Sequence, residues 1–127
     1  MKTPHTLIIG GGIVGTTLAL KLAQAKRPVT LVDAAPKRNK DSWDKALSQR
    51  DARVYALSLA SIGLLKEVGT WQKIAASKRK ADYSQMQVWQ LNGIGELLFS
   101  ENNGNDHKPM LGRMVEPLVI EHALSQC

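Results

Sequence analysis

Blocks of apolar residues alternate with glycine and polar residues over the first quarter of the chain. Residues 6–9 (TLII) form a short apolar run that ends at three glycines, and residues 29–32 (VTLV) form a second one. Between them, residues 13–25 have the periodicity of a helix. Its apolar face carries Val14, Leu18 and Leu22. The pattern predicts a buried helix between two buried parallel strands, a βαβ core over residues 6–33 with a right-handed crossover.

Shorter elements are predicted after a polar surface segment, residues 34–50, which is expected to be partly helical over residues 43–48. Alternation of polar and apolar residues predicts a half-buried strand that returns in a hairpin, at residues 84–90 and 96–100. Helical spacing predicts three further helices, at residues 58–68, 71–76 and from 116 to the end. We expect core or half-buried positions for Trp71, Trp89, Phe99 and the methionines. A polar loop is expected at residues 101–108.

Composition is that of a globular α/β domain. The chain has 127 residues, 43% of them hydrophobic and 22% charged, which fits one domain and excludes a disordered chain. No apolar run approaches the ~20 residues of a membrane span. The single cysteine, Cys127, excludes an internal disulfide and fits a cytoplasmic location.

The net charge of +6 is concentrated in the middle of the chain, where residues 26–80 hold thirteen Lys and Arg against five acids. Neither a continuous basic face interleaved with aromatic residues nor a known reader motif is visible, so we expect no nucleic-acid partner. Solvated loops explain most of this charge. Attraction to an acidic partner or to an anionic membrane surface, at most as a peripheral contact, remains the alternative.

The motif that carries chemistry is GGGIVG, in which the fingerprint glycines are Gly10, Gly12 and Gly15. In a strand–turn–helix context the first glycine permits the tight turn, the second lets backbone N–H groups approach a pyrophosphate, and the third lets the helix pack closely on the strands. The remaining residues of the candidate phosphate loop are Gly11, Ile13 and Val14. The structural alternative is a glycine turn with a capping aspartate and no ligand.

Asp33 ends the second predicted strand and is placed to accept hydrogen bonds from a ribose. An acid at this position favours a ribose with free hydroxyls, and therefore NAD or FAD over NADP. The motif alone does not choose between NAD and FAD. The three histidines show no metal-ligand spacing, no Ser/His/Asp grouping is present, and no catalytic residue is assigned.

Four further segments, in this order, resemble the FAD-dependent hydroxylases of ubiquinone biosynthesis, which belong to the aromatic-ring flavin monooxygenases that include p-hydroxybenzoate hydroxylase. The segments are DARVYALS (residues 51–58), LLKEVGTW (64–71), MQVW (86–89) and LGRMVE (111–116). The resemblance covers almost the whole chain and favours FAD. It implies a Rossmann-like FAD-binding domain of the p-hydroxybenzoate hydroxylase type with a β-hairpin insertion.

The resemblance also implies site residues. The glycine loop and Asp33 would hold the ADP half of FAD, and Arg53 would lie near the middle or flavin part. Arg113 is a weaker candidate of the same kind. The alternative for Arg53 is a surface arginine paired with Asp51. Two departures are that Asp33 replaces the more usual glutamate, and that Pro117 stands where the family often has asparagine.

The implied reaction is hydroxylation of a polyprenylated phenol or quinone precursor with NAD(P)H and O2. The resemblance also implies other ubiquinone-biosynthesis proteins as partners. Because family members are about three times longer, we expect residues 1–127 to be the amino-terminal part of an FAD-binding domain. The second FAD motif and the substrate domain are expected to be missing, which would leave the chain itself inactive. The alternative is a stand-alone nucleotide-binding or interaction module without catalysis.

Overall fold

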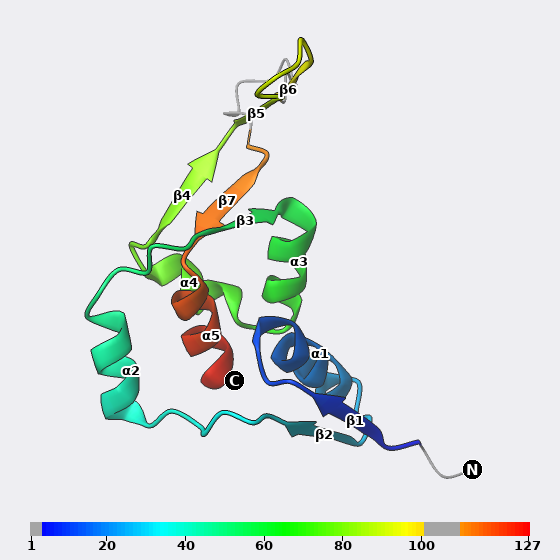
Figure 1. Cartoon of the computed structure of the whole chain (residues 1–127). Helices are drawn as coiled ribbons and strands as arrows, with labels where there is room; N and C mark the ends of the chain where they lie inside the picture. Colours follow the sequence, from blue (N-terminus) through cyan, green and yellow to red (C-terminus); the bar gives the residue numbers. More distant parts are fainter. Residues whose placement is uncertain (1–3, 101–109) are drawn as a thin grey trace.

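The computed structural model describes residues 4–100 and 110–127, which fold into a mixed α/β structure with three small sheets (Figure 1). The first sheet pairs β1 (Thr6–Ile9) with β2 (Val29–Val32) in parallel, and α1 (Ile13–Gln24) connects them. Thr6 lies opposite Val29 and Ile9 opposite Val32. The predicted βαβ core is therefore confirmed in its elements and in its parallel pairing.

The prediction of which face of α1 is buried is wrong. Val14 is 82% exposed and Leu18 is 48% exposed, whereas the buried residue of α1 is Thr17. Thr17 lies on the side of the helix from which Ile13 and Leu20 pack against the hydrophobic core. All of β2 beyond Val29 is exposed, because α1 is the main element that covers this two-stranded sheet.

A second, three-stranded sheet was not predicted. It consists of β3 (Tyr55–Ser58), β7 (Gly112–Val115) and β4 (Lys80–Tyr83). β7 is the central strand and pairs antiparallel with both neighbours. Each strand has four residues, and β7 pairs with segments far away in the sequence, so local periodicity gives little indication of this sheet.

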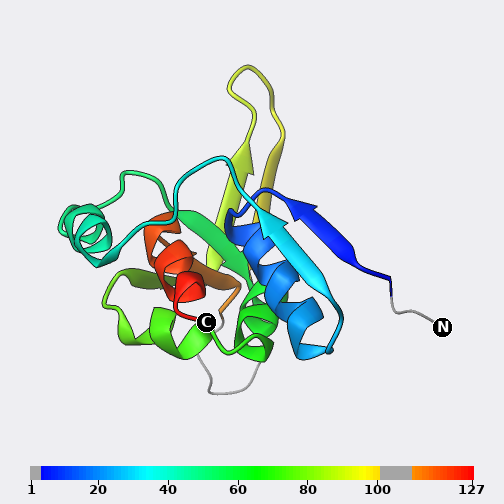
Figure 2. The ribbon, with the colours of Figure 1, turned by 90° about the horizontal axis from the view of Figure 1, so that it is seen from below.

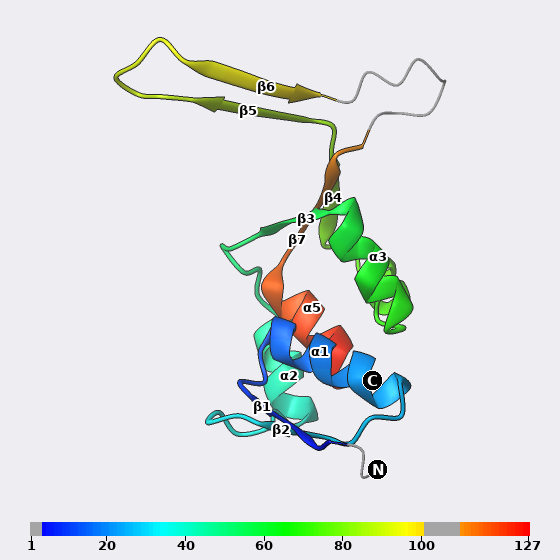
Figure 3. The same cartoon turned by 90° about the vertical axis from the view of Figure 1, so that its right-hand side faces the viewer.

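The predicted hairpin is present as β5 (Gln85–Trp89) and β6 (Glu96–Ser100), with Gln85 opposite Ser100. It projects away from the helices, as Figure 3 shows. The expectation of half-buried positions is wrong here, since every residue of both strands is exposed, including Trp89 and Phe99. Among the described residues, no other sheet or helix packs against the hairpin. The expected polar loop at 101–108 lies outside those residues.

The hydrophobic core lies among three helices and the central strand β7, below the hairpin (Figure 2). The helices are α3 (Leu59–Glu67), α4 (Trp71–Ala76) and α5 (Pro117–Ser125), each close to its predicted range. The remaining helix, α2 (Lys40–Leu47), lies in the polar segment and has no buried residue. The core side chains are Ile62, Leu65, Trp71, Ile74, Val115, Val119, Ile120, Ala123 and Leu124. The core therefore places α5 beside α1 and its glycine turn.

Candidate nucleotide-binding site

The glycine turn between β1 and α1 has the geometry that the fingerprint predicts. Gly10 has φ +108°, a conformation that L side chains rarely adopt, and its N–H donates to the Val32 carbonyl at 2.7 Å. A Cβ on Gly15 would lie 1.9 Å from the Gly10 carbonyl oxygen. Two of the three glycines are thus required by the fold itself, because they let α1 begin directly against the end of β1.

The amino terminus of α1 has unused hydrogen-bonding capacity. Gly12 is the N-cap residue and provides no side-chain acceptor, and the first turn contains no acid. The first N–H groups of a helix have no partner within the helix. A Cβ on Gly12 would meet nothing within 4 Å, so the space in front of these donors is open. This combination of free donors, helix dipole and open space fits the diphosphate of a dinucleotide.

Asp33 lies directly after β2, beside the glycine turn. Its Oδ2 accepts the Gly11 N–H at 2.5 Å and its Oδ1 accepts the Ala35 N–H at 2.7 Å. These two backbone donors, that of Gly11 first, hold the pKa of the Asp33 carboxyl below its usual value. An ionised carboxylate has about four acceptor positions, so two remain for the hydroxyl groups of a ribose.

Two cavities border the glycine turn. The larger, about 760 Å³, extends from Gly12 past Asp33 towards α2 and α5, a size within the usual range for small-molecule sites. The smaller, about 580 Å³, lies on the other side of the turn and is bordered by Tyr55. Glu121 of α5 lines both cavities. Sequence analysis did not identify this acid, because it belongs to none of the motifs.

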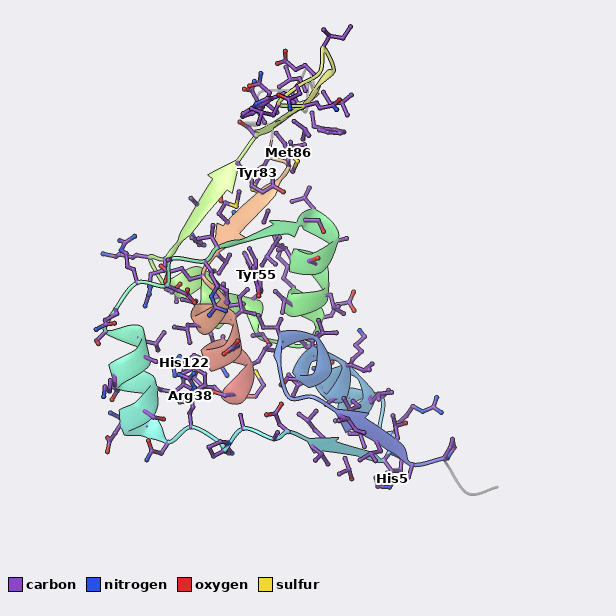
Figure 4. All side chains as sticks on the ribbon, in the orientation of Figure 1. His5, Arg38, Tyr55, Tyr83, Met86 and His122 are labelled. Atoms are coloured by element: carbon purple, nitrogen blue, oxygen red, sulfur yellow. The ribbon has the colours of Figure 1, made fainter. Side chains whose placement is uncertain are left out.

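The far end of the larger cavity is basic and aromatic. Lys37, Arg38 and Trp43 line it. The Arg38 guanidinium lies 4.9 Å from the centre of the Trp43 ring, whose other neighbour is the His122 ring at 5.1 Å between centroids. Figure 4 shows Arg38 and His122 close together between α2 and α5. The basic residues at 37 and 38, expected to be solvated, therefore border the candidate site.

The structure does not bring the two candidate arginines into the cavities described above; neither Arg53 nor Arg113 is among their lining residues in the described part of the chain. Arg53 forms an ion pair with Asp51, with 3.0 Å between Nη2 and Oδ2, which is the alternative stated for it. Its side chain is nevertheless 69% exposed, and Tyr55, two residues later, borders the smaller cavity.

Arg113 lies on β7 and faces the core. Its Nε lies 2.7 Å from Asp82 Oδ1 without the alignment of a hydrogen bond, and its guanidinium lies 5.4 Å from the centre of the Trp71 ring. These contacts give Arg113 a packing role between the sheet and α4. Its cofactor role stays a prediction.

The ion pair between Arg79 and Glu116 is a buried polar contact that sequence analysis missed. The Arg79 side chain is 17% exposed and that of Glu116 is 7% exposed. The Arg79 Nε donates to Glu116 Oε1 at 2.9 Å, and the Arg79 Nη2 donates to Glu116 Oε2. This guanidinium holds the pKa of the Glu116 carboxyl below its usual value in spite of burial. The partners are 37 residues apart, so only the fold reveals them.

The described residues give no indication of other kinds of site. Across 4–100 and 110–127, no three His, Cys, Asp or Glu side chains are grouped so that they could hold a metal ion. No helix in this part of the chain has the length and apolar character needed to span a bilayer.

Comparison with known proteins identifies the class. The model of the family described as FAD dependent oxidoreductase matches residues 5–95, so the chain belongs to that family. It is 37% identical over 119 residues to the 3-demethoxyubiquinol 3-hydroxylase of Escherichia coli (strain K12), covering 94% of this chain and 28% of that protein. It is 35% identical over 108 residues to the mitochondrial ubiquinone biosynthesis monooxygenase COQ6 of Drosophila melanogaster, covering 80% of this chain and 22% of that protein.

The fold is also found in a solved oxygenase. The structure of 2-methyl-3-hydroxypyridine-5-carboxylic acid oxygenase, mutant Y270A, superposes with a TM-score of 0.62 over 98% of this chain and 29% of its own, at 17% identity. This likeness confirms the predicted α/β fold class. The chain spans about a quarter of the length of the curated relatives described above.

Proposed function

We propose that this chain binds the ADP half of FAD at the amino terminus of α1, as part of a flavin-dependent hydroxylase that acts on a ubiquinone precursor. The observation that carries the proposal is the open, uncapped helix terminus behind a Gly10–Gly15 turn with Asp33 beside it. Membership of the FAD dependent oxidoreductase family supports FAD over NAD.

Each part of the turn has a separate task in this proposal. The N–H groups at the start of α1, from Gly12 to Gly15, donate to the diphosphate, and the missing side chain at Gly12 gives it room. Asp33 accepts from the ribose hydroxyls with the lone pairs that the backbone leaves free. Arg53 supplies a cation towards the middle or flavin part, which stabilises negative charge there.

When bound, FAD supplies the electron-transfer and oxygen-transfer chemistry, with NAD(P)H as the reductant and O2 as the source of the hydroxyl oxygen. The substrate would be a polyprenylated phenol or quinone precursor, since the relatives are named for ubiquinone biosynthesis. We further propose that residues 1–127 correspond to the first FAD-binding portion of such an enzyme. A second FAD motif and a substrate domain would then complete the active site.

Titration of the ¹⁵N-labelled chain with ADP, FAD and 2′,5′-ADP, followed by NMR, tests the nucleotide site. We expect weak binding of ADP and FAD with the largest shifts at Gly10–Gly15 and Asp33. The 2′-phosphate of 2′,5′-ADP should weaken binding because it would lie beside the ionised Asp33 carboxylate. The Asp33→Asn variant should lose this discrimination. Largest shifts far from the glycine turn would contradict the proposal.

Activity of the chain distinguishes the proposal from its alternative. We expect no NAD(P)H-dependent turnover from these 127 residues. Stoichiometric yellow flavin with turnover would show that a larger domain is not required. Tight binding of ADP or NAD with no affinity for flavin would instead favour a nucleotide-binding or interaction module without catalysis.

A further inference from the structure

We propose that Glu116 is a positioning residue for Arg53, acting through the Asp51 segment, with Arg79 holding Glu116 in place. This inference rests on the proposed function of Arg53 as the cation beside the cofactor. It concerns the buried Glu116 and the partly buried Arg79, which have no direct part in the nucleotide site described above.

The first step is the anchoring of Glu116. It is the N-cap residue of α5 and is almost fully buried, and its two carboxylate oxygens accept from Arg79. Arg79 also donates to the carbonyl oxygens of Leu47 and Gln49, at 2.9 Å and 2.6 Å. The guanidinium therefore has four directed contacts, which fix its plane and that of the carboxylate.

The second step connects Glu116 to the Asp51 segment. The backbone N–H of Asp51 donates to Glu116 Oε2 at 2.8 Å, across 65 residues of sequence. Because Arg79 holds Gln49 on one side and Glu116 holds Asp51 on the other, the short linker between α2 and β3 is tied to the start of α5. A buried charge-assisted hydrogen bond of this kind is directional.

The third step leads from Asp51 to Arg53. The Asp51 side chain is only 9% exposed, and its Oδ1 accepts from both the backbone N–H and the Nε of Arg53, at 3.0 Å and 3.1 Å. With Asp51 fixed, the edge of the Arg53 guanidinium that carries Nε and Nη2 is fixed as well, because both atoms donate to the Asp51 carboxylate. Its outer edge stays exposed and free to bind an anion.

The residues around Arg53 connect it to the candidate site. Tyr55 borders the smaller cavity, so the segment from Asp51 to Tyr55 leads onto the glycine turn. Asp51 makes the largest contribution to raising the pKa of Arg53, and Glu121, which lines both cavities, adds to it. Both carboxylates therefore stabilise the charged form of the Arg53 guanidinium.

The test uses the ¹⁵N-labelled full chain and the variants Glu116→Gln, Arg53→Ala and both together. Glu67→Gln, which removes the carboxylate of the exposed ion pair with Lys21, is the matched control. The first measurement is the Nε–H NMR signal of Arg53. We expect a protected signal in the unmodified chain and in Glu67→Gln, and its loss in Glu116→Gln. An unchanged Arg53 signal in folded Glu116→Gln would overturn the inference.

The second measurement is FAD affinity by NMR titration. Arg53→Ala should weaken binding about tenfold, as expected for one charge-assisted hydrogen bond. Glu116→Gln should weaken it as well, but should have no further effect in the Arg53→Ala background. Additive effects would overturn the positioning role. Unchanged affinity in Arg53→Ala would contradict the cofactor role of Arg53 alone, leaving the Nε–H signal to decide the positioning.

If Glu116→Gln fails to fold, the unmodified chain gives the answer. A scalar coupling across the hydrogen bond between the Asp51 amide nitrogen and the Glu116 carboxyl carbon, with slow exchange of that amide, would support the link. Absence of the coupling together with fast exchange of the amide would overturn it.

Discussion

Gly15 illustrates how one hydrogen atom in place of a methyl group determines the fold around the glycine turn. A Cβ there would lie 1.9 Å from the Gly10 carbonyl oxygen and 3.1 Å from the Gly10 carbonyl carbon, both backbone atoms that cannot rotate away. Gly12, three residues earlier, faces open space. The same motif therefore contains two kinds of glycine. Gly15 is required by packing, whereas at Gly12 only a bound ligand would require the absence of a side chain.

The first prediction is that Gly15→Ala lowers the free energy of unfolding by about 3 kcal/mol, because α1 must move away from β1 to relieve the contact. Urea unfolding followed by circular dichroism measures this. The matched control is Gly63→Ala in α3, where the new Cβ would meet nothing within 4 Å. That variant should gain about 0.5–1 kcal/mol, since alanine favours the helix interior. Equal effects of the two substitutions would contradict the packing argument.

The residues that could be predicted from the sequence are those whose role is set by their neighbours in the chain. The conformation of Gly10 and the place of Asp33 at the end of β2 follow from a strand, a turn and a helix that are adjacent in the chain. Glu116 and Arg79 could not be predicted, because a buried ion pair between residues 37 positions apart leaves no periodic or motif signal.

Among the elements, those predicted well have their pattern within one short stretch of the sequence. The helices α3, α4 and α5 and the hairpin are near their expected places. The strands β3, β4 and β7 were missed because four residues give too short an alternation, and because β7 makes them a sheet only by pairing far along the chain. The prediction of burial failed for the same reason. Whether an apolar face is buried depends on which other elements pack against it, and these are distant in the sequence.

The second prediction concerns the hairpin. Its tip carries Trp89, Leu91 and Ile94 at 68%, 89% and 109% exposure. Replacing all three by serine should change the free energy of unfolding by no more than about 0.5 kcal/mol for each residue, because they are mostly exposed in this structure. Binding of a hydrophobic dye should fall. Ile74→Ala, at a fully buried position of α4, is the control and should cost about 2–5 kcal/mol.

A loss of stability in the triple hairpin variant comparable to that of Ile74→Ala would show that the tip packs against the body of the molecule. Urea unfolding of both variants, with dye fluorescence recorded under native conditions, makes the comparison direct.

For the whole molecule, the ion pair of Arg79 and Glu116 joins segments that are far apart in the sequence. Through Leu47, Gln49 and Asp51, this ion pair holds the linker after α2 against the start of α5, next to the three-stranded sheet. Its energetic effect should therefore be seen in global unfolding and not only in local motion. A buried carboxylate whose partner is a guanidinium also makes stability depend on pH in a defined direction.

The third prediction is that acid selectively removes this contribution. Arg79, more than the Asp51 backbone N–H, holds the pKa of Glu116 below its ordinary value of 4.5. A lowered folded-state pKa means that the stabilisation is fully present above the unfolded-state value and is lost as pH falls through the folded-state value. At neutral pH, Glu116→Gln should cost about 3 kcal/mol, since Arg79 is left buried without its charge partner.

Urea unfolding of the two proteins between pH 7 and pH 3 checks this prediction. The free energy of unfolding of the parent chain should be nearly constant down to about pH 5, then fall more steeply than that of Glu116→Gln, so that the difference between them narrows. Asp33 and Asp51 also have lowered pKa values, so the variant keeps a shallower acid dependence of its own. Glu67→Gln, which breaks an exposed pair, should follow the parent chain within about 0.5 kcal/mol. A constant difference between the parent chain and Glu116→Gln across the whole range would mean that the Glu116 carboxylate does not carry the charge assigned to it.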